Sequence, residues 1–306
     1  MGELSLIEKF RAGAPQHPAI IVGPGSDCAV LNWPSSTDLL FKIDQVVEGT
    51  HFLLSGPEAA TPRQVGWKAM AKTCSDIAAA GGWPIAAMVA MNVRKGTDES
   101  VVMGVYDGLV ACCKKFNVGL AGGDFSSSEN GLSVVVSLTG SCPQNTAWTR
   151  AGAKPGDVLF VTGALGGSRA VKHLSFTPRL YEAFRIREML SNGVHACIDI
   201  TDGLSRDLKH ICTESHCGAV VHASSVPLLN APNEADGLRA ALSDGEDFEL
   251  LLAVSPEAAD TLATDWDYDT PLTRIGNIVE HALGMSLIGF DGVARAWTDS
   301  GYEHVV

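Results

Sequence analysis

The chain has 306 residues, of which 46% are hydrophobic and 19% are charged, and its formal net charge is −13. A length prior of roughly 150 residues per domain predicts two domains, and the composition is that of a globular protein with a sizeable core. The acidic charge argues against nucleic acid, which is bound mainly through Lys and Arg. No apolar run approaches the roughly 20 residues of a membrane helix, so no membrane association is expected.

The eight cysteines form no CxxC pair, and most of them lie among apolar residues. Free Cys in such surroundings behaves as a small hydrophobe, which favours a reduced, cytoplasmic protein over a disulfide scaffold. The N-terminal segment carries charges every few residues and is therefore not read as a secretory signal.

Strand-like and helical patterns alternate in the first half of the chain. Residues 39–44 alternate in polarity, 63–80 and 100–116 have helical patterns, and Val134–Val136 predicts a strand buried on both sides. Because residues 39–44 have a period of two, Asp44 is expected on the face opposite the apolar side chains, outside the core.

The second half repeats the interleaving of strands and helices. Strands are predicted at 158–162, 196–200, near Val220 and at 248–254, and helices from Ser168 and over 203–213. This pattern predicts a mixed α/β architecture in both halves. The polar stretch 143–155 suggests domains of residues 1–145 and 146–306.

A glycine-rich turn follows the strand at 158–162, but no Gly-Lys-Ser/Thr comes after it, so a Walker A loop is absent. Glycines in such a turn are also explained by backbone geometry alone.

Acidic residues recur at element ends or beside glycines, where a ligand can approach the backbone. They are Asp27, Asp44, Asp76, Asp124, Asp199, Asp202 and Glu246. Magnesium prefers oxygen ligands and shares them with substrate phosphates, so these carboxylates favour metal-assisted phosphate chemistry. Four of them also have a simpler explanation: a turn at Asp27, a surface ion pair at Asp44, a Lys72–Asp76 helix pair and an N-cap at Asp202.

The order of these segments resembles the thiamine-monophosphate kinases, in the superfamily that includes aminoimidazole ribonucleotide synthetase. The matching segments span nearly the whole chain. They are 23–31, 44–52, 65–84, 122–140, 149–168, 198–211, 244–252 and 301–305.

The resemblance implies a kinase that converts ATP and thiamine monophosphate into ADP and thiamine diphosphate by direct in-line transfer assisted by Mg²⁺. By motif position, metal binding is expected from Asp27, Asp44, Asp76, Asp124, Asp199 and Asp202. Nucleotide contacts are expected from Gly123, Asp124, Arg150 and Thr201, and substrate contacts from His51, Glu246 and Tyr302. Asp124, Asp202 and Arg150 are the expected catalytic residues.

The same resemblance implies an aminoimidazole ribonucleotide synthetase-like fold. Its N-terminal α/β domain would bind ATP and metal and pair its sheet with that of a second copy in a homodimer, and a C-terminal α/β domain would follow.

Two positions depart from the family pattern. Ser26-Asp27 stands where the family has paired aspartates, and Lys42-Ile43-Asp44 replaces a hydroxyl-bearing strand end. Because Lys42 shares the face of Asp44, we hypothesise that its ammonium takes over part of one cation's charge. The number of magnesium ions is therefore left open.

Other functions remain possible within and outside the superfamily. Selenophosphate synthetase would need an N-terminal reactive Cys, and a hydrogenase-maturation relative a C-terminal Cys; the corresponding segments have none. A kinase or synthetase with a different acceptor, and a catalytically decayed nucleotide-binding protein, stay open.

Overall fold

The computed structural model describes residues 9–10, 12–22, 30–31, 33–229, 233–297 and 301. The chain divides into two compact units, which are described separately. Unit 1 consists of residues 1–77, 82–145 and 174–177, and unit 2 of residues 78–81, 146–173 and 178–306. Over the described residues, no helix is both long and apolar enough to cross a membrane.

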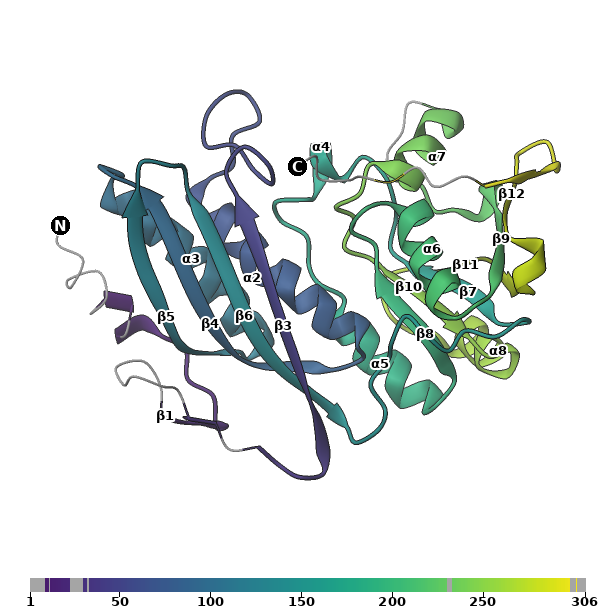
Figure 1. Cartoon of the computed structure of the whole chain (residues 1–306), viewed down its shortest axis with the longest axis horizontal. Helices are drawn as coiled ribbons and strands as arrows, with labels where there is room; N and C mark the ends of the chain where they lie inside the picture. Colours follow the sequence, from purple (N-terminus) through teal and green to yellow (C-terminus); the bar gives the residue numbers. More distant parts are fainter. Residues whose placement is uncertain are drawn as a thin grey trace. The chain divides into compact units, whose positions relative to one another are not determined.

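Unit 1 is built on a four-stranded mixed sheet with the strand order β3-β6-β4-β5 (Figure 1). β3 pairs with β6 and β6 with β4 in antiparallel register, whereas β4 and β5 are parallel. A small ribbon of β1 and β2 precedes it. The elements are β1 (Ile20–Val22), β2 (Val30–Leu31), β3 (Thr37–Val47), α2 (Pro62–Ala79), β4 (Trp83–Arg94), α3 (Glu99–Phe116), β5 (Gly119–Ser128) and β6 (Ser133–Pro143).

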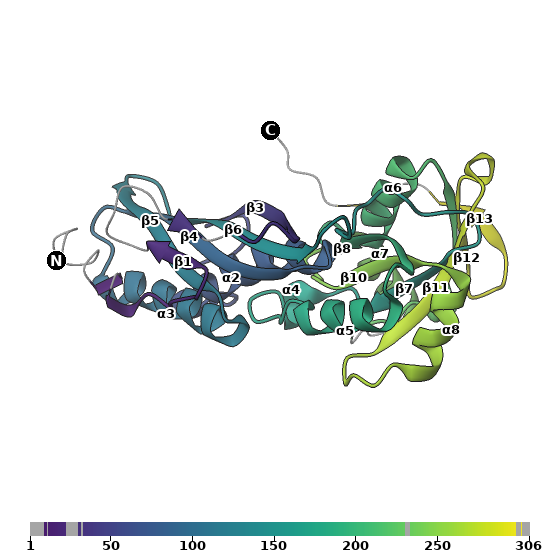
Figure 2. The same cartoon turned by 90° about the horizontal axis from the view of Figure 1, so that it is seen from below.

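Helices α2 and α3 cover one face of this sheet, as the two views of Figures 1 and 2 agree. Both helices were predicted from their patterns and are confirmed within a residue or two at each end. The stripe expected along α2 is buried, with Val65, Met70 and Cys74 fully so. In β6 every second side chain is buried, including Val134 and Val136, while Val135 is partly exposed. The continuous burial predicted there is wrong because one sheet face is left open.

Strand β3 presents its apolar side chains to the open face of the sheet. Leu39, Phe41 and Ile43 are 52%, 71% and 62% exposed. Lys42 and Asp44 lie on the opposite, partly buried face. The sequence correctly separates these two faces, but the expectation that Asp44 lies outside the core is wrong, since the helices cover its side of the sheet.

Unit 2 contains a seven-stranded mixed sheet with the order β13-β12-β9-β11-β7-β10-β8. All neighbouring pairs are antiparallel except β9 and β12. Its strands are β7 (Val158–Thr162), β8 (Val194–Asp199), β9 (Gly218–His222), β10 (Leu250–Val254), β11 (Leu272–Val279), β12 (Met285–Ile288) and β13 (Ala294–Ala296).

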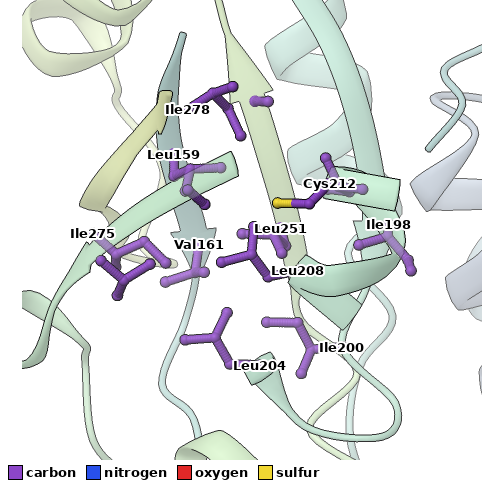
Figure 3. Close-up of a cluster of buried hydrophobic side chains, with 14 of the residues drawn as sticks. Leu159, Val161, Ile198, Ile200, Leu204, Leu208, Cys212, Leu251, Ile275 and Ile278 are labelled. Carbon is purple, nitrogen blue, oxygen red and sulfur yellow. The ribbon is translucent and has the colours of Figure 1, made fainter. Parts of the chain in front are cut away.

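The helices of unit 2 lie on both sides of this sheet, with α6 on one side and α5 and α8 on the other (Figure 2). They are α4 (Ser168–Val171), α5 (Leu180–Leu190), α6 (Leu204–Glu214), α7 (Glu234–Ser243) and α8 (Pro256–Asp265), with 3₁₀ turns at Ala223–Ser225 and His281–Leu283. α6 contributes Leu204, Leu208 and Cys212 to a core that also contains Leu159 and Leu251 from the central strands (Figure 3). Because both faces are covered, every residue of β7 and β10 is buried.

The helix predicted from Ser168 is only the short α4. It ends after one turn, where the backbone N–H of His173 donates to the carbonyl of Ser168, five residues back, and so leaves the four-residue spacing of an α-helix. The two mixed sheets and their helices confirm the predicted mixed α/β class.

Candidate functional site

In unit 1, Lys42 bridges Asp44 of β3 and Asp76 of α2, and Lys72 also contacts Asp44. Lys42 Nζ lies 2.7 Å from Asp76 Oδ1 and 3.3 Å from Asp44 Oδ2, and Lys72 Nζ lies 3.1 Å from Asp44 Oδ1. Two carboxylates expected to bind metal are therefore neighbours, and their negative charge is met by two ammonium groups.

Burial acts to raise the pKa of Asp44, but contact with Asp76 and the charges of Lys72 and Lys42 outweigh it. The pKa of Asp44 therefore lies below its usual value and the side chain is ionised near neutral pH. Among the described residues, Asp44 Oδ2 is one of the few buried polar atoms that make no hydrogen bond. This oxygen retains lone pairs that a cation or a water molecule could use.

Asp124 lies away from this pair within the unit. It pairs in register with Ala90 of β4, whereas its neighbour Gly123 pairs with Val89. Following the pairing across β4 and β6, Asp124 lies in the same row as Gln45 of β3. Asp124 is therefore on the open face of the sheet. Its strand β5 and the strand of Asp44, β3, are the two opposite edges. The Asp124 side chain is exposed. The structure thus does not bring Asp124 together with Asp44 and Asp76 in unit 1.

His51 is fixed by a tight turn after β3. Its Nδ1 accepts a hydrogen bond from the backbone N–H of Val47 at 3.1 Å, and its carbonyl accepts one from Lys68 Nζ at 2.7 Å. Lys68 is completely buried, which its helical position beside Lys72 did not predict. It anchors the turn of His51 to α2.

In unit 2, Asp199 ends strand β8 and is followed by a loop that carries Thr201 and Asp202. Asp199 is only 4% exposed. The backbone of this loop pairs with the segment that contains Glu246: Glu246 N donates to Thr201 O at 2.7 Å, and Phe248 N donates to Ile200 O at 2.8 Å. The residues predicted to bind metal (Asp199 and Asp202), nucleotide (Thr201) and substrate (Glu246) therefore lie on adjacent segments.

Asp202 does not cap helix α6 with its side chain, contrary to one reading of the sequence. The N-cap position is Gly203, and no side chain caps it. Instead, Asp207 Oδ2 accepts hydrogen bonds from the backbone N–H groups of Thr201 and Asp202 at 2.9 and 3.0 Å. The loop is thus fixed by an acid from inside the helix.

Asp202, Asp207 and His210 place ligand atoms within 4.8 Å of one another, the one such group among the described residues. Burial raises the pKa of Asp207 well above its usual value, with the charges of Asp199 and Asp202 adding to it and the two backbone hydrogen bonds opposing it. Asp207 and His210 were not predicted from the sequence. Their signal is helical spacing after Asp202, which places an acid and an imidazole on one side of α6.

Glu246 occupies a strained backbone position, with φ at 57°, and Phe248 two residues later has φ at 52°. Such conformations cost free energy in non-glycine residues and are concentrated at functional sites. Glu246 Oε2 lies 3.2 Å from His173 Nδ1 and 3.6 Å from Arg169 Nε. These two partners come from the segment at and after α4 and were also missed from the sequence.

The acids on either side of Phe248 hold this segment in place. Buried Asp247 accepts hydrogen bonds from Gly166 N at 3.0 Å and from the hydroxyl of Ser168. Burial raises the pKa of Asp247 to about 6, against the lowering effect of those two bonds. The glycine-rich turn therefore binds a carboxylate of the same chain through its backbone.

Glu249 is 1% exposed and is surrounded by donors. It accepts from Arg179 Nε at 2.6 Å, Lys172 Nζ at 2.6 Å and Thr162 Oγ1 at 2.8 Å. Burial acts to lower the pKa of Arg179, but the bond to Glu249 outweighs it and the pKa is raised. This network ties α4 and α5 to the central strands.

Arg150 has an exposed side chain on a segment that runs beside β8. Thr149 O accepts from Cys197 N of β8 at 2.8 Å, and Arg150 O accepts from Ser215 Oγ at 3.0 Å. The backbone is thus fixed on both sides while the guanidinium remains available. Asp27 and Tyr302 lie outside the described residues.

Gly245 makes the close approach of the two loops possible. Its φ is +71°, and a Cβ there would lie 2.4 Å from Thr201 O. Gly245→Ala is therefore expected to reduce the free energy of unfolding by about 2–3 kcal/mol, from backbone strain and the clash together. Chemical denaturation of the full chain measures this loss.

Gly156→Ala is the matched control, because Gly156 has φ +99° with nothing within 4 Å of the added Cβ. Only the conformational penalty of about 1 kcal/mol should appear there. Equal losses in the two variants would contradict the close approach at Gly245.

Both halves of the chain match known families. A family model described as the N-terminal domain of AIR synthase related protein matches residues 25–142, and the corresponding C-terminal domain matches residues 154–285. The thiamine-monophosphate kinase of Rhodopirellula baltica is 37% identical over 291 residues, which cover 90% of this chain and 89% of that protein.

Solved structures agree with these matches. Thiamine-monophosphate kinase from Stenotrophomonas maltophilia K279a superimposes with a TM-score of 0.81 at 29% identity, covering 96% of this chain and 98% of that chain. AaThiL, solved in complex with AMPPCP and TMP, has a TM-score of 0.74 at 26% identity, covering 99% and 96%. The expected two-domain aminoimidazole ribonucleotide synthetase-like fold is confirmed, whereas the roles of individual site residues stay predictions.

Proposed function

Because the chain belongs to the thiamine-monophosphate kinase family of AIR-synthase-related proteins, we propose that it is an ATP-dependent thiamine-monophosphate kinase. The γ-phosphoryl group of ATP passes directly to a phosphate oxygen of thiamine monophosphate, which yields thiamine diphosphate and ADP. The observation that carries this proposal is the match of nearly the whole chain to AaThiL, whose structure contains AMPPCP and TMP.

The donor set of the candidate site fits magnesium. The expected ligands are all carboxylates, which suit a hard cation. Asp44 Oδ2 is a buried oxygen that makes no hydrogen bond, although the Lys42 ammonium lies 3.3 Å from it. We propose that Mg²⁺ is held by carboxylates from the set Asp27, Asp124, Asp199 and Asp202. Asp44 and Asp76, which already contact Lys42 and Lys72, are the least available of the expected ligands. When bound, it supplies positive charge against the phosphate oxygens of both anionic reactants.

The remaining work is positioning by the chain itself, which dominates catalysis of phosphoryl transfer. Arg150 is proposed to contact phosphate oxygens, because its side chain is exposed on a segment fixed beside β8. Gly123, Asp124 and Thr201 are proposed to contact the nucleotide, and His51, Glu246 and Tyr302 the thiamine phosphate. Glu246 is suited to the cationic thiazolium ring because its carboxylate carries the opposite charge, and its backbone is fixed by the hydrogen bond to Thr201 O.

A homodimer through the open face of the unit 1 sheet is also proposed. That face exposes Leu39, Phe41, Ile43 and Met88, the last 48% exposed. Large apolar side chains exposed on one sheet face are typical of a protein interface, although Ser137 of β6 separates Met88 from Ile43 here. Asp124 lies on the same face, so a partner there would change its surroundings.

The test is incubation of the purified chain with ATP, Mg²⁺ and thiamine monophosphate, with separation of the products. Thiamine diphosphate and ADP in equal amounts, and neither without magnesium, are expected. Nucleotide binding without turnover would instead support a non-catalytic nucleotide-binding protein, and turnover only with another phosphorylated acceptor would identify a different kinase.

A further inference from the structure

One ammonium group bridges the two carboxylates of unit 1 that come from separate elements. Lys42 Nζ lies 2.7 Å from Asp76 Oδ1 on α2 and 3.3 Å from Asp44 Oδ2 on β3. Lys72 Nζ reaches the other oxygen of Asp44 at 3.1 Å. The bridging ammonium thus occupies the space between a pair of carboxylates where a shared cation would otherwise be expected.

Over the part of the chain that the structure describes, the formal charges of this cluster are balanced. Two carboxylates face two ammonium groups, and the four side chains are between 16% and 35% exposed. An isolated exposed Lys–Asp pair contributes little because water screens it. Here the groups are largely shielded, so each charge matters more to its neighbours.

A divalent cation between Asp44 and Asp76 would have to displace Lys42. Magnesium requires oxygen ligands at about 2.1 Å in an octahedral arrangement, with no cationic group inside that shell. The displaced ammonium would lose two carboxylate contacts, and Lys72 would repel the incoming ion. Binding of a metal ion at this position is therefore opposed by both lysines.

We propose that Lys42 is a built-in cation that bridges Asp44 and Asp76 in place of a divalent metal ion. The chain accordingly binds one metal ion fewer than its carboxylates would otherwise hold, and β3 and α2 are joined here without metal. The proposal rests on the proposed function only in taking these two carboxylates as part of a cation site.

The test counts bound metal ions rather than turnover. The full chain is stripped with EDTA and titrated with Mn²⁺, and the number of bound ions is measured by electron paramagnetic resonance and calorimetry. Lys42→Met, which keeps an unbranched side chain only one atom shorter and removes the charge, should bind one more Mn²⁺ than the unsubstituted chain. Its thermal midpoint should fall in EDTA and recover with Mn²⁺, because two adjacent carboxylates then lack their bridge.

Lys95→Met is the matched control, since Lys95 forms an exposed ion pair with Glu129 in the same unit. It should bind as many Mn²⁺ ions as the unsubstituted chain. In Lys42→Met/Asp76→Asn the additional ion should be lost again. An unchanged Mn²⁺ count in Lys42→Met, with a midpoint that does not depend on the metal, would overturn the proposal.

If Lys42→Met folds neither in EDTA nor with Mn²⁺, Lys42→Arg tests the proposal instead, because it keeps the positive charge. It should fold without metal and bind the original number of Mn²⁺ ions, and an additional ion in that variant would count against Lys42 as a cation. Since no substrate is present, failure of this proposal is distinct from failure to form thiamine diphosphate.

Discussion

Replacing Asp124 with asparagine is expected to lower kcat for thiamine diphosphate formation by at least about 100-fold, because a charge that acts on the transferring phosphoryl group is removed. The fold should be unaffected, since the side chain is exposed on the open face of the unit 1 sheet. Steady-state assays with ATP and thiamine monophosphate measure the loss, and circular dichroism with thermal denaturation verifies the fold.

Glu129→Gln provides the control for this prediction. Glu129 is an exposed carboxylate close in sequence to Asp124, and its recorded partner is the exposed Lys95. The same loss of one negative charge there should leave kcat within about twofold, which corresponds to less than about 0.5 kcal/mol. Full activity of Asp124→Asn would show that Asp124 is not a catalytic residue. Strand β5 would then lack its main expected role.

Replacing Glu249 with glutamine is expected to reduce the free energy of unfolding by about 3 kcal/mol, because breaking a buried ion pair leaves cations without their partner. Arg179 and Lys172 both contact this carboxylate and are only 19% and 18% exposed. Without Glu249, Arg179 would keep Glu182 at 3.1 Å as an acidic partner. The thermal midpoint should fall by roughly 6–12 °C for a chain of this size. Thermal and urea denaturation of the full chain provide the measurement.

Two further variants separate charge loss from other effects. Glu249→Gln/Arg179→Met removes one charge of each sign and should recover part of the stability lost in Glu249→Gln, as expected for coupled residues. Glu214→Gln, at the exposed end of α6, should change stability by less than about 0.5 kcal/mol. If Glu249→Gln and Glu214→Gln reduced the free energy of unfolding equally, the network around Glu249 would have no special structural role.

Much of the secondary structure could be predicted because local periodicity reports it directly. The helical spacing of Val65, Met70 and Cys74 identifies α2, and the apolar run at 158–162 coincides with β7. The same reasoning failed at Ser168, where the helix ends after one turn and a backbone N–H five residues later donates to the Ser168 carbonyl. It also missed β4, whose alternation is obscured by a register shift near Ala86.

The candidate site was only partly predictable. Acids at element ends identified Asp199, Asp202 and Glu246, which the fold of unit 2 brings into adjacent loops. Asp207 and Glu249 hold those loops in place, but their role depends on which backbone groups and cations approach them. Such contacts join residues up to 87 positions apart, as Thr162 and Glu249 are, and no local pattern encodes them.

The sequence by itself determined that Lys42 and Asp44 share one face of a strand and that Leu39, Phe41 and Ile43 share the other, because strand geometry alternates with period two. Only the tertiary structure decided which face the helices cover, since period alone does not say where a partner packs. It therefore placed the apolar side chains in the open and Lys42 against Asp76 of α2. The local pattern sets each residue's direction, and packing of distant segments sets what it meets.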